Sequence, residues 1–392
     1  MAIYSGIEPT LPSEQLAPLE DLAFELVSSA SSLAGQLNPI VRDGIGDLVR
    51  SMNCYYSNLI EGHNTLPRDI ERALAKQYST EPQKRNLQLE AVAHIEVQRK
   101  IDFGEDERAE PVSVDYIRWL HREFCSRLPE DLLWVENPDT GERLHVTPGE
   151  IRTRAVKVGM HVPPTGDELA AALQRFHEAY TAPMSKFRKV VAVAAAHHRF
   201  LWIHPFLDGN GRVARLMAHA MLNRLGIGSS LWSVSRGLSR NVAEYKALLM
   251  GADSQRQSDY DGRGDLSEKA LIEFCRFFLR ICIDQVAFMR SILDPENLLR
   301  RIELYCRDEV DAGRLPKSSY IVLREVVLAG EIERGRVPAI VNLQERAARN
   351  VTSALIEKKL LESESSRAPL RLGFPTEAVE RWFPSLYPAT GN

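Results

Sequence analysis

The chain has 392 residues, of which 44% are hydrophobic and 26% are charged, with a formal net charge of −4 at pH 7. This balance is typical of a globular protein of two or three domains and does not favour a polyanion as the main partner. The apolar run at residues 190–196 is far shorter than the roughly 20 residues a bilayer requires, and the N-terminus does not resemble a signal peptide. The five cysteines are widely spaced without a Cys-x-x-Cys pair, so we expect a cytoplasmic protein without disulfides, zinc or membrane contact.

The first part of the chain is predicted to be helical. Apolar residues recur with a spacing of 3.6 residues between Leu16 and Val27, which indicates a helix with one buried face. A second helix runs from about Leu48 to Leu59 and ends near Gly62, a residue type that often follows a helix. The polar stretch at 104–113 is a connection, so we expect an N-terminal helical region over residues 1–110.

The middle of the chain, residues 111–295, is predicted to be a helical core with one irregular region. That region, 134–164, is rich in proline and glycine, and its alternation at 151–158 predicts a short hairpin. The helices expected after it cover residues 167–181, 185–203 and 211–225. The fold class is therefore mainly α.

The last part, residues 296–392, has the order of elements of a winged helix-turn-helix domain. A helix near 318–329 is followed by two more helices, a polar run and an alternating segment suited to a two-stranded wing. Basic residues in or near the expected recognition helix are Arg346, Arg349, Lys358 and Lys359. A solvated helix face explains them equally well. Binding of DNA and contact with protein therefore both stay open.

Residues 204–215 read HPFLDGNGRVAR and contain the residue types needed for phosphate chemistry. Pro205 ends an apolar helix, and the loop Gly209-Asn210-Gly211 leads directly into the next helix. Backbone N–H groups at such a helix start form an anion site. Arg212 and Arg215 add positive charge one turn apart, each contributing about 4 kcal/mol to a phosphate at about 4 Å and an effective dielectric constant near 20.

Two other side chains of this segment complete the chemistry. Asp208 would repel a phosphate unless it holds a Mg²⁺ ion that bridges phosphate oxygens. His204 has an ordinary pKa near neutrality and can take a proton from an attacking hydroxyl. Together these parts predict transfer of a Mg²⁺-bound nucleotide. A zinc site formed by His197, His198 and His204 is disfavoured, because adjacent residues of a helix point to different faces.

The segment resembles the Fic motif, HPFx[D/E]GNGRxxR, at every fixed position, and the resemblance covers about residues 45–290. It implies a Fic-fold core that transfers AMP from ATP to a Ser, Thr or Tyr hydroxyl of a target protein, with ATP and Mg²⁺ bound. His204 is then the general base and Asp208 the Mg²⁺ ligand. The residues implied in ATP and phosphate binding are Gly209, Asn210, Gly211, Arg212 and Arg215.

Two further segments are similar to parts of Fic proteins. The stretch 148–164 resembles the flap, so that residues 151–158 would hold the target by strand pairing. The segment 241–253 resembles the helix on the adenine side, which implies that Tyr245 and Asp253 lie near the base. An ordinary surface hairpin and a plain core tyrosine remain as alternatives.

The sequence SNLIEG at 57–62 resembles the inhibitory motif of Fic proteins, and its place before the catalytic motif corresponds to class II. The residues of this motif are Ser57, Glu61 and Gly62. Glu61 stands at the end of a helix, where a negative charge opposes the helix dipole by about 0.3–1 kcal/mol. By the resemblance it faces Arg215 and keeps that arginine from the γ-phosphate. An exposed helix-end charge is the alternative.

Three alternative functions follow from the same residues. Relatives that phosphorylate their targets tend to carry lysine in place of the second motif glycine, and Gly211 disfavours that reaction. Removal of AMP, with Glu61 positioning water, stays open, alone or together with transfer. A DNA-binding regulator with the Fic core as a sensor is the third. Self-modification and a homodimer also stay open.

Overall fold

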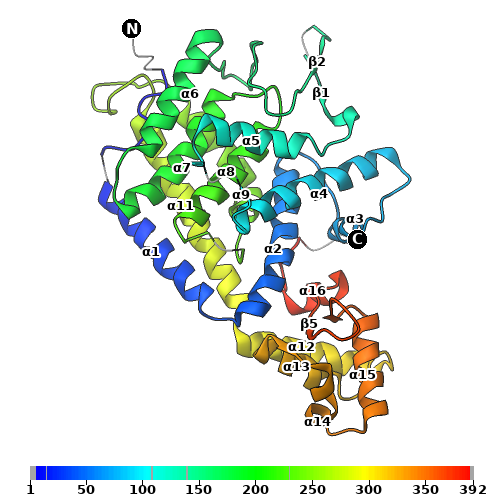
Figure 1. Ribbon diagram of the computed structural model, residues 1–392. Helices are drawn as coiled ribbons and strands as arrows, with labels where there is room; N and C mark the ends of the chain where they lie inside the picture. Colours follow the sequence, from blue (N-terminus) through cyan, green and yellow to red (C-terminus); the bar gives the residue numbers. More distant parts are fainter. Residues whose placement is uncertain (1–5, 15, 107–108, 138–139, 229, 389–392) are drawn as a thin grey trace. The chain divides into compact units, whose positions relative to one another are not determined.

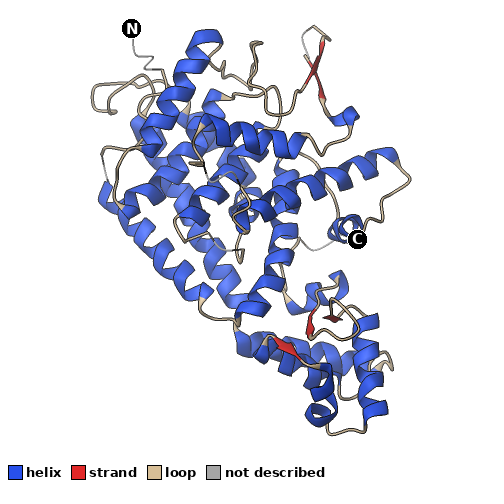
Figure 2. Cartoon of the chain, in the orientation of Figure 1, coloured by secondary structure: helices blue, strands red, loops and turns tan. Residues whose placement is uncertain are grey.

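The computed structural model describes residues 6–14, 16–106, 109–137, 140–228 and 230–388 (Figure 1). These residues are mostly helical with a few short strands, which confirms the predicted fold class (Figure 2). The helices are α1 (Leu16–Ala34), α2 (Pro39–Ile60), α3 (Pro67–Leu74), α4 (Pro82–Asp102), α5 (Val114–Cys125), α6 (Gly166–Thr181), α7 (Lys186–Ile203), α8 (Asn210–Arg224), α9 (Val234–Arg240), α10 (Val242–Ala252), α11 (Glu268–Ile292), α12 (Pro295–Asp311), α13 (Ser319–Ala329), α14 (Val337–Val341), α15 (Glu345–Glu357) and α16 (Thr376–Trp382). The strands are β1 (Trp134–Glu136), β2 (Arg143–His145), β3 (Glu331–Ile332), β4 (Leu361–Glu362) and β5 (Leu370–Leu372).

The chain divides into two compact units. The first comprises Met1–Ala30, Asn53–Ser229 and Ser233–Gln285, and the second comprises the rest of the chain. The predicted boundaries at residues 110 and 295 stay a prediction. Within the described ranges, no helix has the length and apolar character needed to cross a membrane.

Helices α7 and α8 form the centre of the first unit. They pack on each other, with α6 against α7 and with α4, α5 and α9 against α8. The apolar run at residues 190–196 of α7 is completely buried, as are Leu216 and Met217 of α8. Burial of each large apolar side chain contributes about 1.5–3 kcal/mol. The short loop that joins α7 to α8 is therefore fixed between two well-packed helices.

The strands of the first unit do not lie where the sequence predicted a hairpin. β1 and β2 pair antiparallel, with Val135 opposite Leu144. The hairpin predicted at 151–158 is reduced to a single bridge between Val158 and His161. The physical reason is that the N–H of Arg152 is bonded to the carbonyl of Pro205 at 2.9 Å, which ties the segment to the α7–α8 loop.

The N-terminal segment before α1 lies across the first unit. Its main-chain carbonyls accept hydrogen bonds from side chains of α6 and α7. Arg199 donates through Nε to Pro9 at 2.9 Å, and the Tyr180 hydroxyl donates to Thr10 at 2.6 Å. Ile7 of this segment is fully buried. These residues therefore belong to the core that supports α7.

The second unit contains a three-stranded antiparallel sheet in the order β3-β5-β4. Helix α13 contacts β3 and β5, and α12 contacts α13 and α16. The apolar strand residues Ile332, Leu361, Leu370 and Leu372 are buried. Trp382 of α16 is buried as well, with its ring edge-on to Tyr305 of α12.

Candidate active site

The end of α7 turns sharply at His204. This residue has left-handed backbone angles, φ 49° and ψ 62°, and its N–H is bonded to the carbonyl of Phe200 at 2.9 Å. Such a conformation costs a residue other than glycine about 1–3 kcal/mol, and Pro205 then prevents further helix. Gly209, with φ 79°, makes the second turn and leads into α8. The loop thus has His204 at one end and the start of α8 at the other.

The loop between the two helices is held by its own side chains. Asn210 donates through Nδ2 to the carbonyl of Phe206 at 2.9 Å and accepts from the N–H of Phe206 at 3.0 Å. The buried Phe206 ring stacks on His121 with 3.9 Å between ring centres. Asn210 therefore shapes the loop. Gly209, the residue before it, has no side chain that could cap the first N–H groups of α8, so these groups stay available to a ligand. Those groups suit an anion.

His204 is half-buried, and its pKa is low. Burial first, and then the neighbouring Arg152, lower the pKa of His204 to about 4. The Arg152 guanidinium is fixed there because its Nε donates to the His204 carbonyl at 2.7 Å. The imidazole is therefore neutral at pH 7 and is able to accept a proton.

Asp208 is placed at the rim of the same loop. Its side chain is 47% exposed, and its Oδ2 lies 3.6 Å from Nη2 of Arg212. The described residues hold no cluster of three or more acidic, His or Cys side chains that would bind a metal alone. One exposed carboxylate beside an anion loop nevertheless fits Mg²⁺, which usually takes one or two carboxylates and completes its shell with phosphates and water.

Arg215 is held by the end of helix α2. Its Nε donates to the Ser57 hydroxyl at 2.9 Å, and its Nη2 donates to the Ser57 carbonyl at 3.1 Å and to Oε1 of Glu61 at 2.5 Å. The Arg215 side chain is 1% exposed, whereas that of Glu61 is 30% exposed. Gly62 follows with φ 88° and ends the helix. The structure thus brings together Ser57, Glu61 and Arg215.

The charge of Glu61 is stabilised by both motif arginines. Burial alone would raise the pKa of Glu61, but Arg215 and Arg212 outweigh it and the net shift is downward. Glu61 also lies against the first turn of α8, because a Cβ atom at Gly211 would overlap its Oε1. The carboxylate therefore occupies space at the start of the anion loop.

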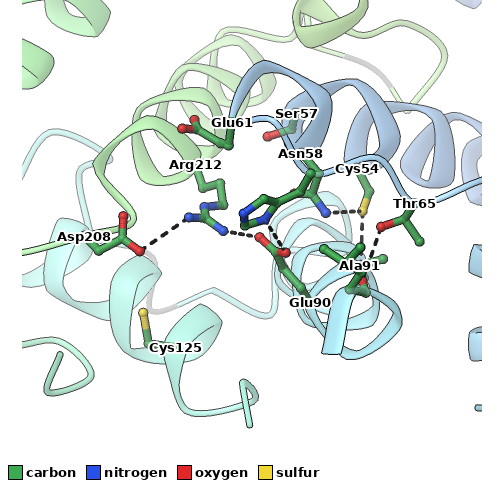
Figure 3. A network of polar contacts seen from close by, with 12 residues as sticks. Cys54, Ser57, Asn58, Glu61, Thr65, Glu90, Ala91, Cys125, Asp208 and Arg212 are labelled. Carbon is green, nitrogen blue, oxygen red and sulfur yellow. Dashed lines mark hydrogen bonds and ion pairs between the residues drawn. The ribbon is translucent and has the colours of Figure 1, made fainter. Parts of the chain in front are cut away.

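Arg212 is bound by a second carboxylate, that of Glu90, which the sequence did not reveal. Its Nη1 donates to Oε1 of Glu90 on α4, and Oε2 of Glu90 lies 2.7 Å from Nδ1 of His63. Figure 3 shows Arg212 between Asp208 and Glu90, with Glu61 nearby. Glu90 is fully buried, and the Arg212 guanidinium also lies 5.2 Å from the ring of Phe124. The sequence offers one sign of this contact, the position of His63 directly after the inhibitory motif.

The two residues predicted on the adenine side contact histidines of α7. Tyr245 is 2% exposed, and its hydroxyl lies 2.7 Å from Nε2 of His197. Oδ1 of Asp253 lies 3.2 Å from Nε2 of His198. His197 and His198 are thus engaged separately, on different sides of the helix. The role of Tyr245 and Asp253 near the base stays a prediction.

The segment predicted as the flap borders a cavity next to the loop. This cavity has a volume of about 250 Å³ and is lined by Leu144, His145, Val146, Thr147, Glu150, Ile151, Arg152, Thr153, Arg154 and Leu207. Arg152 joins the two sides, since Nη2 donates to the Pro164 carbonyl at 2.7 Å while Nε holds that of His204. Arg152 is a further residue that the sequence did not single out.

Comparison with known proteins agrees with this geometry. The model of the Fic/DOC family matches residues 111–222, which include α5 to α7, the whole loop and most of α8. A curated relative, "Protein adenylyltransferase Fic" of Nematostella vectensis, is 29% identical over 174 residues, covering 44% of this chain and 37% of the relative. The protein of the same name from Drosophila willistoni is 34% identical over 126 residues, 31% of this chain and 25% of that protein. The chain thus matches well under half the length of these relatives.

Solved structures share the fold. A Fic family protein from Desulfovibrio desulfuricans G20 superposes with a TM-score of 0.50 at 17% identity, covering 90% of this chain and 96% of that one. A Fic domain containing signaling protein from Bacteroides thetaiotaomicron gives a TM-score of 0.51 at 20% identity, covering 68% and 95%. The match to the family model identifies residues 111–222 as a Fic/DOC family domain.

Proposed function

We propose that this chain is a protein adenylyltransferase that moves AMP from Mg²⁺-bound ATP to a Ser, Thr or Tyr hydroxyl of a target protein. In this reaction the hydroxyl oxygen attacks the α-phosphorus and the bond to the β-phosphate oxygen breaks. Pyrophosphate leaves, and the hydroxyl proton passes to Nε2 or Nδ1 of His204. The curated relatives named above carry this activity in their names.

The observation that carries this proposal is the short loop that joins His204, at the end of α7, to the N–H groups at the start of α8. The His204 pKa of about 4 leaves the imidazole free to accept a proton at pH 7. The Gly209-Asn210-Gly211 turn and the first N–H groups of α8 offer a site for phosphate oxygens. Arg212 adds a positive charge on the same side. A proton acceptor and an anion site therefore lie at one loop, as nucleotide transfer to a hydroxyl requires.

Asp208 is the residue that we assign to Mg²⁺. When bound there, the ion would neutralise charge on the phosphates and help to orient them. Asp208 is exposed enough to reach a ligand, and Arg212 limits its mobility at 3.6 Å. The phosphates themselves would be bound by Gly209, Asn210, Gly211, Arg212 and Arg215.

Residues 151–158 are assigned to holding the target. The cavity of about 250 Å³ beside this segment and the bond from the N–H of Arg152 to the Pro205 carbonyl support the assignment, because Arg152 lines the cavity and also donates to the His204 carbonyl. Three apolar residues at the end of the segment and just after it, Val158, Met160 and Val162, are 42%, 91% and 66% exposed. An extended target segment that pairs with residues 151–158 and continues past residue 158 would cover them.

Glu61 is assigned as an inhibitor of class II type. It binds Arg215 at 2.5 Å together with Ser57, so the arginine has little capacity left for a γ-phosphate. Its partial exposure supports displacement, since the carboxylate can move into water when the contact opens. Removal of AMP by the same site is the second candidate, because the same exposed carboxylate could orient a water molecule.

The C-terminal part, residues 296–392, is assigned to a winged helix-turn-helix domain. The order α13, β3, α14, α15, β4 and β5 supports this class. Arg349 of α15 is paired with Glu345 at 3.4 Å, which reduces its value as a DNA contact. We favour contact with protein, including a second copy of the chain, over DNA, because Lys and Arg barely outnumber Asp and Glu in this part of the chain. The cytoplasmic location belongs to this proposal as well.

The test is labelling of protein with ATP that carries ³²P at the α-phosphate. Wild type, Glu61→Gly and Glu61→Gly/His204→Ala are compared on a cell lysate and on the purified chain alone. The proposal expects α-label, but no γ-label, to enter protein with Glu61→Gly and to disappear with the His204 change. Entry of γ-label would indicate phosphorylation instead. Loss of label from a pre-modified protein on adding wild type would favour AMP removal.

A further inference from the structure

The two motif arginines are held by two carboxylates that differ in accessibility. Glu61, at the end of α2, has a side chain that is 30% exposed, and it binds Arg215. Glu90, in the middle of α4, has a side chain that is fully buried, and it binds Arg212. A partly exposed carboxylate can exchange its arginine for water, whereas a buried one would leave two unpaired charges in the interior. Glu61 is thus suited to release its arginine and Glu90 to retain it.

The arginines also differ in how many of their donors are used. Arg215 spends Nε and Nη2 on Ser57 and Glu61. Arg212 gives only Nη1 to Glu90, and its Nη2 is 3.6 Å from Asp208. Nε of Arg212 is buried and has no hydrogen-bond partner in the described part of the chain. A guanidinium has five N–H donors, so Arg212 keeps donors for a ligand while it is held on one side.

Glu90 is itself held from the opposite direction. Its Oε2 lies 2.7 Å from Nδ1 of His63, the residue that follows Gly62 after the inhibitory helix. His63 is 36% exposed, and its pKa is raised, chiefly by the hydrogen bond with Glu90. A carboxylate bonded through both oxygens has little freedom to rotate. Arg212 therefore faces Asp208 from a fixed support (Figure 3).

We propose that Glu90 is a positioning residue, which holds Arg212 by Nη1 so that its remaining donors serve the phosphates of a bound nucleotide, and that His63 holds Glu90. This inference rests on the nucleotide site of the proposed function. It assigns opposite roles to the two carboxylates that bind the motif arginines. Glu61 opposes nucleotide binding in the productive position, and Glu90 supports it. The opposite hypothesis is that Glu90 is a second inhibitor, whose removal frees Arg212.

The experiment compares Glu90→Gln with Glu96→Gln, both made in Glu61→Gly. Glu96 lies on the same helix, is only partly buried, and receives the same substitution, which makes it a matched control. Affinity is measured by calorimetric titration with a non-hydrolysable ATP analogue and with adenosine, and AMP transfer is measured as kcat and KM for ATP. Folding is checked by circular dichroism and thermal unfolding.

The expected result is a loss of at least ten-fold in affinity for the ATP analogue with Glu90→Gln, and a rise in KM that exceeds the fall in kcat. Adenosine affinity should stay within about two-fold, because adenosine has no phosphates for Arg212. Glu96→Gln should change neither ligand by more than about two-fold. Unchanged or tighter binding of the analogue with Glu90→Gln would overturn the positioning role, and tighter binding would make Glu90 an inhibitor.

A second set of variants covers the case in which Glu90→Gln does not fold. Glu90→Asp keeps the buried charge but shortens its reach by one methylene, and His63→Gln removes an imidazole that is already partly in water. Both should weaken the ATP analogue by about three-fold or more while sparing adenosine. If a folded Glu90→Asp binds the analogue as tightly as its parent, the inference is wrong. If His63→Gln binds the analogue with normal affinity, His63 does not hold Glu90 in the way proposed.

The inference and the proposed function fail in different ways. If no variant transfers AMP, but the ATP analogue binds and its affinity follows Glu90, the transferase proposal falls and the positioning role stands. If Glu61→Gly transfers AMP and neither the affinity nor KM responds to Glu90, the positioning role falls and the transferase stands.

Discussion

Glu61 fills the space in which a side chain at position 211 would lie. A Cβ atom built on Gly211 would overlap Oε1 of Glu61, and it would be 3.2 Å from Nη1 of Arg215. Gly211 stands in the first turn of α8, where glycine has no advantage from helix propensity. The close contact at this position therefore comes from the carboxylate of Glu61, directly after α2, and it links the end of the inhibitory helix to the phosphate loop.

This contact predicts a change of sign for Gly211→Ala. In wild type the added methyl displaces the carboxylate of Glu61 and leaves the buried Arg215 without it, which should lower the free energy of unfolding by about 1–3 kcal/mol. In Glu61→Gly the overlap is absent. There the better helix propensity of alanine means that Gly211→Ala should raise the free energy of unfolding by up to about 1 kcal/mol. Urea unfolding of the four proteins measures the coupling between the two sites. An equal effect of Gly211→Ala in both backgrounds would contradict the contact.

Glu61→Gly should increase AMP transfer by about ten-fold or more. If the pair with Arg215 favours the closed arrangement by roughly 2–3 kcal/mol, only about one molecule in 30–150 is competent at a given moment. Removal of the carboxylate frees Arg215 for the γ-phosphate, so ATP can lie with its α-phosphorus in line with the hydroxyl. Incorporation of labelled AMP into protein measures the gain.

The control for this prediction is Arg215. Arg215→Ala should not be activated, because it provides no arginine for the γ-phosphate, and the double variant should resemble Arg215→Ala. An unchanged signal for a folded Glu61→Gly would leave Glu61 as a charge at the end of a helix.

The local parts of the site could be predicted from the sequence because their chemistry lies within a few residues. The segment from His204 to Arg215 is short, and its proline and glycines fix the turns of the loop that precedes α8. The end of helix α2 near Gly62 followed from the apolar spacing up to Leu59 and from the glycine itself, whereas the start of the helix at Pro39 lies well before the predicted one near Leu48. The pairing of Glu61 with Arg215 came from the family resemblance, and the structure places the two in contact.

The residues that the sequence did not reveal depend on distant packing. Glu90 precedes Arg212 by 122 residues and lies among apolar residues of α4, where a glutamate would ordinarily be read as exposed. The alternating pattern at 151–158 predicted a hairpin. Instead, the N–H of Arg152 in this segment donates to the Pro205 carbonyl in the loop after α7, a partner that no local pattern indicates. The N-terminal segment likewise owes its place to Arg199 and Tyr180, side chains far along the chain.

Asp208→Asn should remove most of the stimulation of AMP transfer by Mg²⁺. The neutral amide keeps the size of the side chain but is a weaker ligand for a hard cation. The measurement is the initial rate in Glu61→Gly at increasing Mg²⁺, with and without the Asp208 change. We expect the half-saturating Mg²⁺ concentration to rise by about ten-fold or the rate to stay low throughout. An unaltered Mg²⁺ dependence would exclude Asp208 as the ligand.

The pH dependence of AMP transfer should reflect the low pKa of His204. Burial, followed by Arg152, lowers this pKa from an ordinary value of about 6.5 to about 4. The neutral, proton-accepting form is therefore present from pH 8 down to about pH 5, and it is lost only as the pH falls through about 4. A histidine with an ordinary pKa would instead lose half of its activity at about pH 6.5. The same depressed pKa favours the folded chain above pH 6.5, and this contribution declines as the pH falls toward 4.

The test uses Glu61→Gly, so that release of the inhibitor does not limit the rate. Initial rates of AMP incorporation at low ATP are measured between pH 5 and 8, with the thermal stability of the protein recorded at each pH. Glu61→Gly/His204→Ala supplies the baseline, because a general base contributes about 10²–10⁴-fold to the rate. We expect the His204-dependent rate at pH 5.5 to stay within about three-fold of that at pH 7.5. A fall with an apparent pKa near 6.5, in protein that is still folded, would show that His204 lies in a more polar environment than this structure gives it.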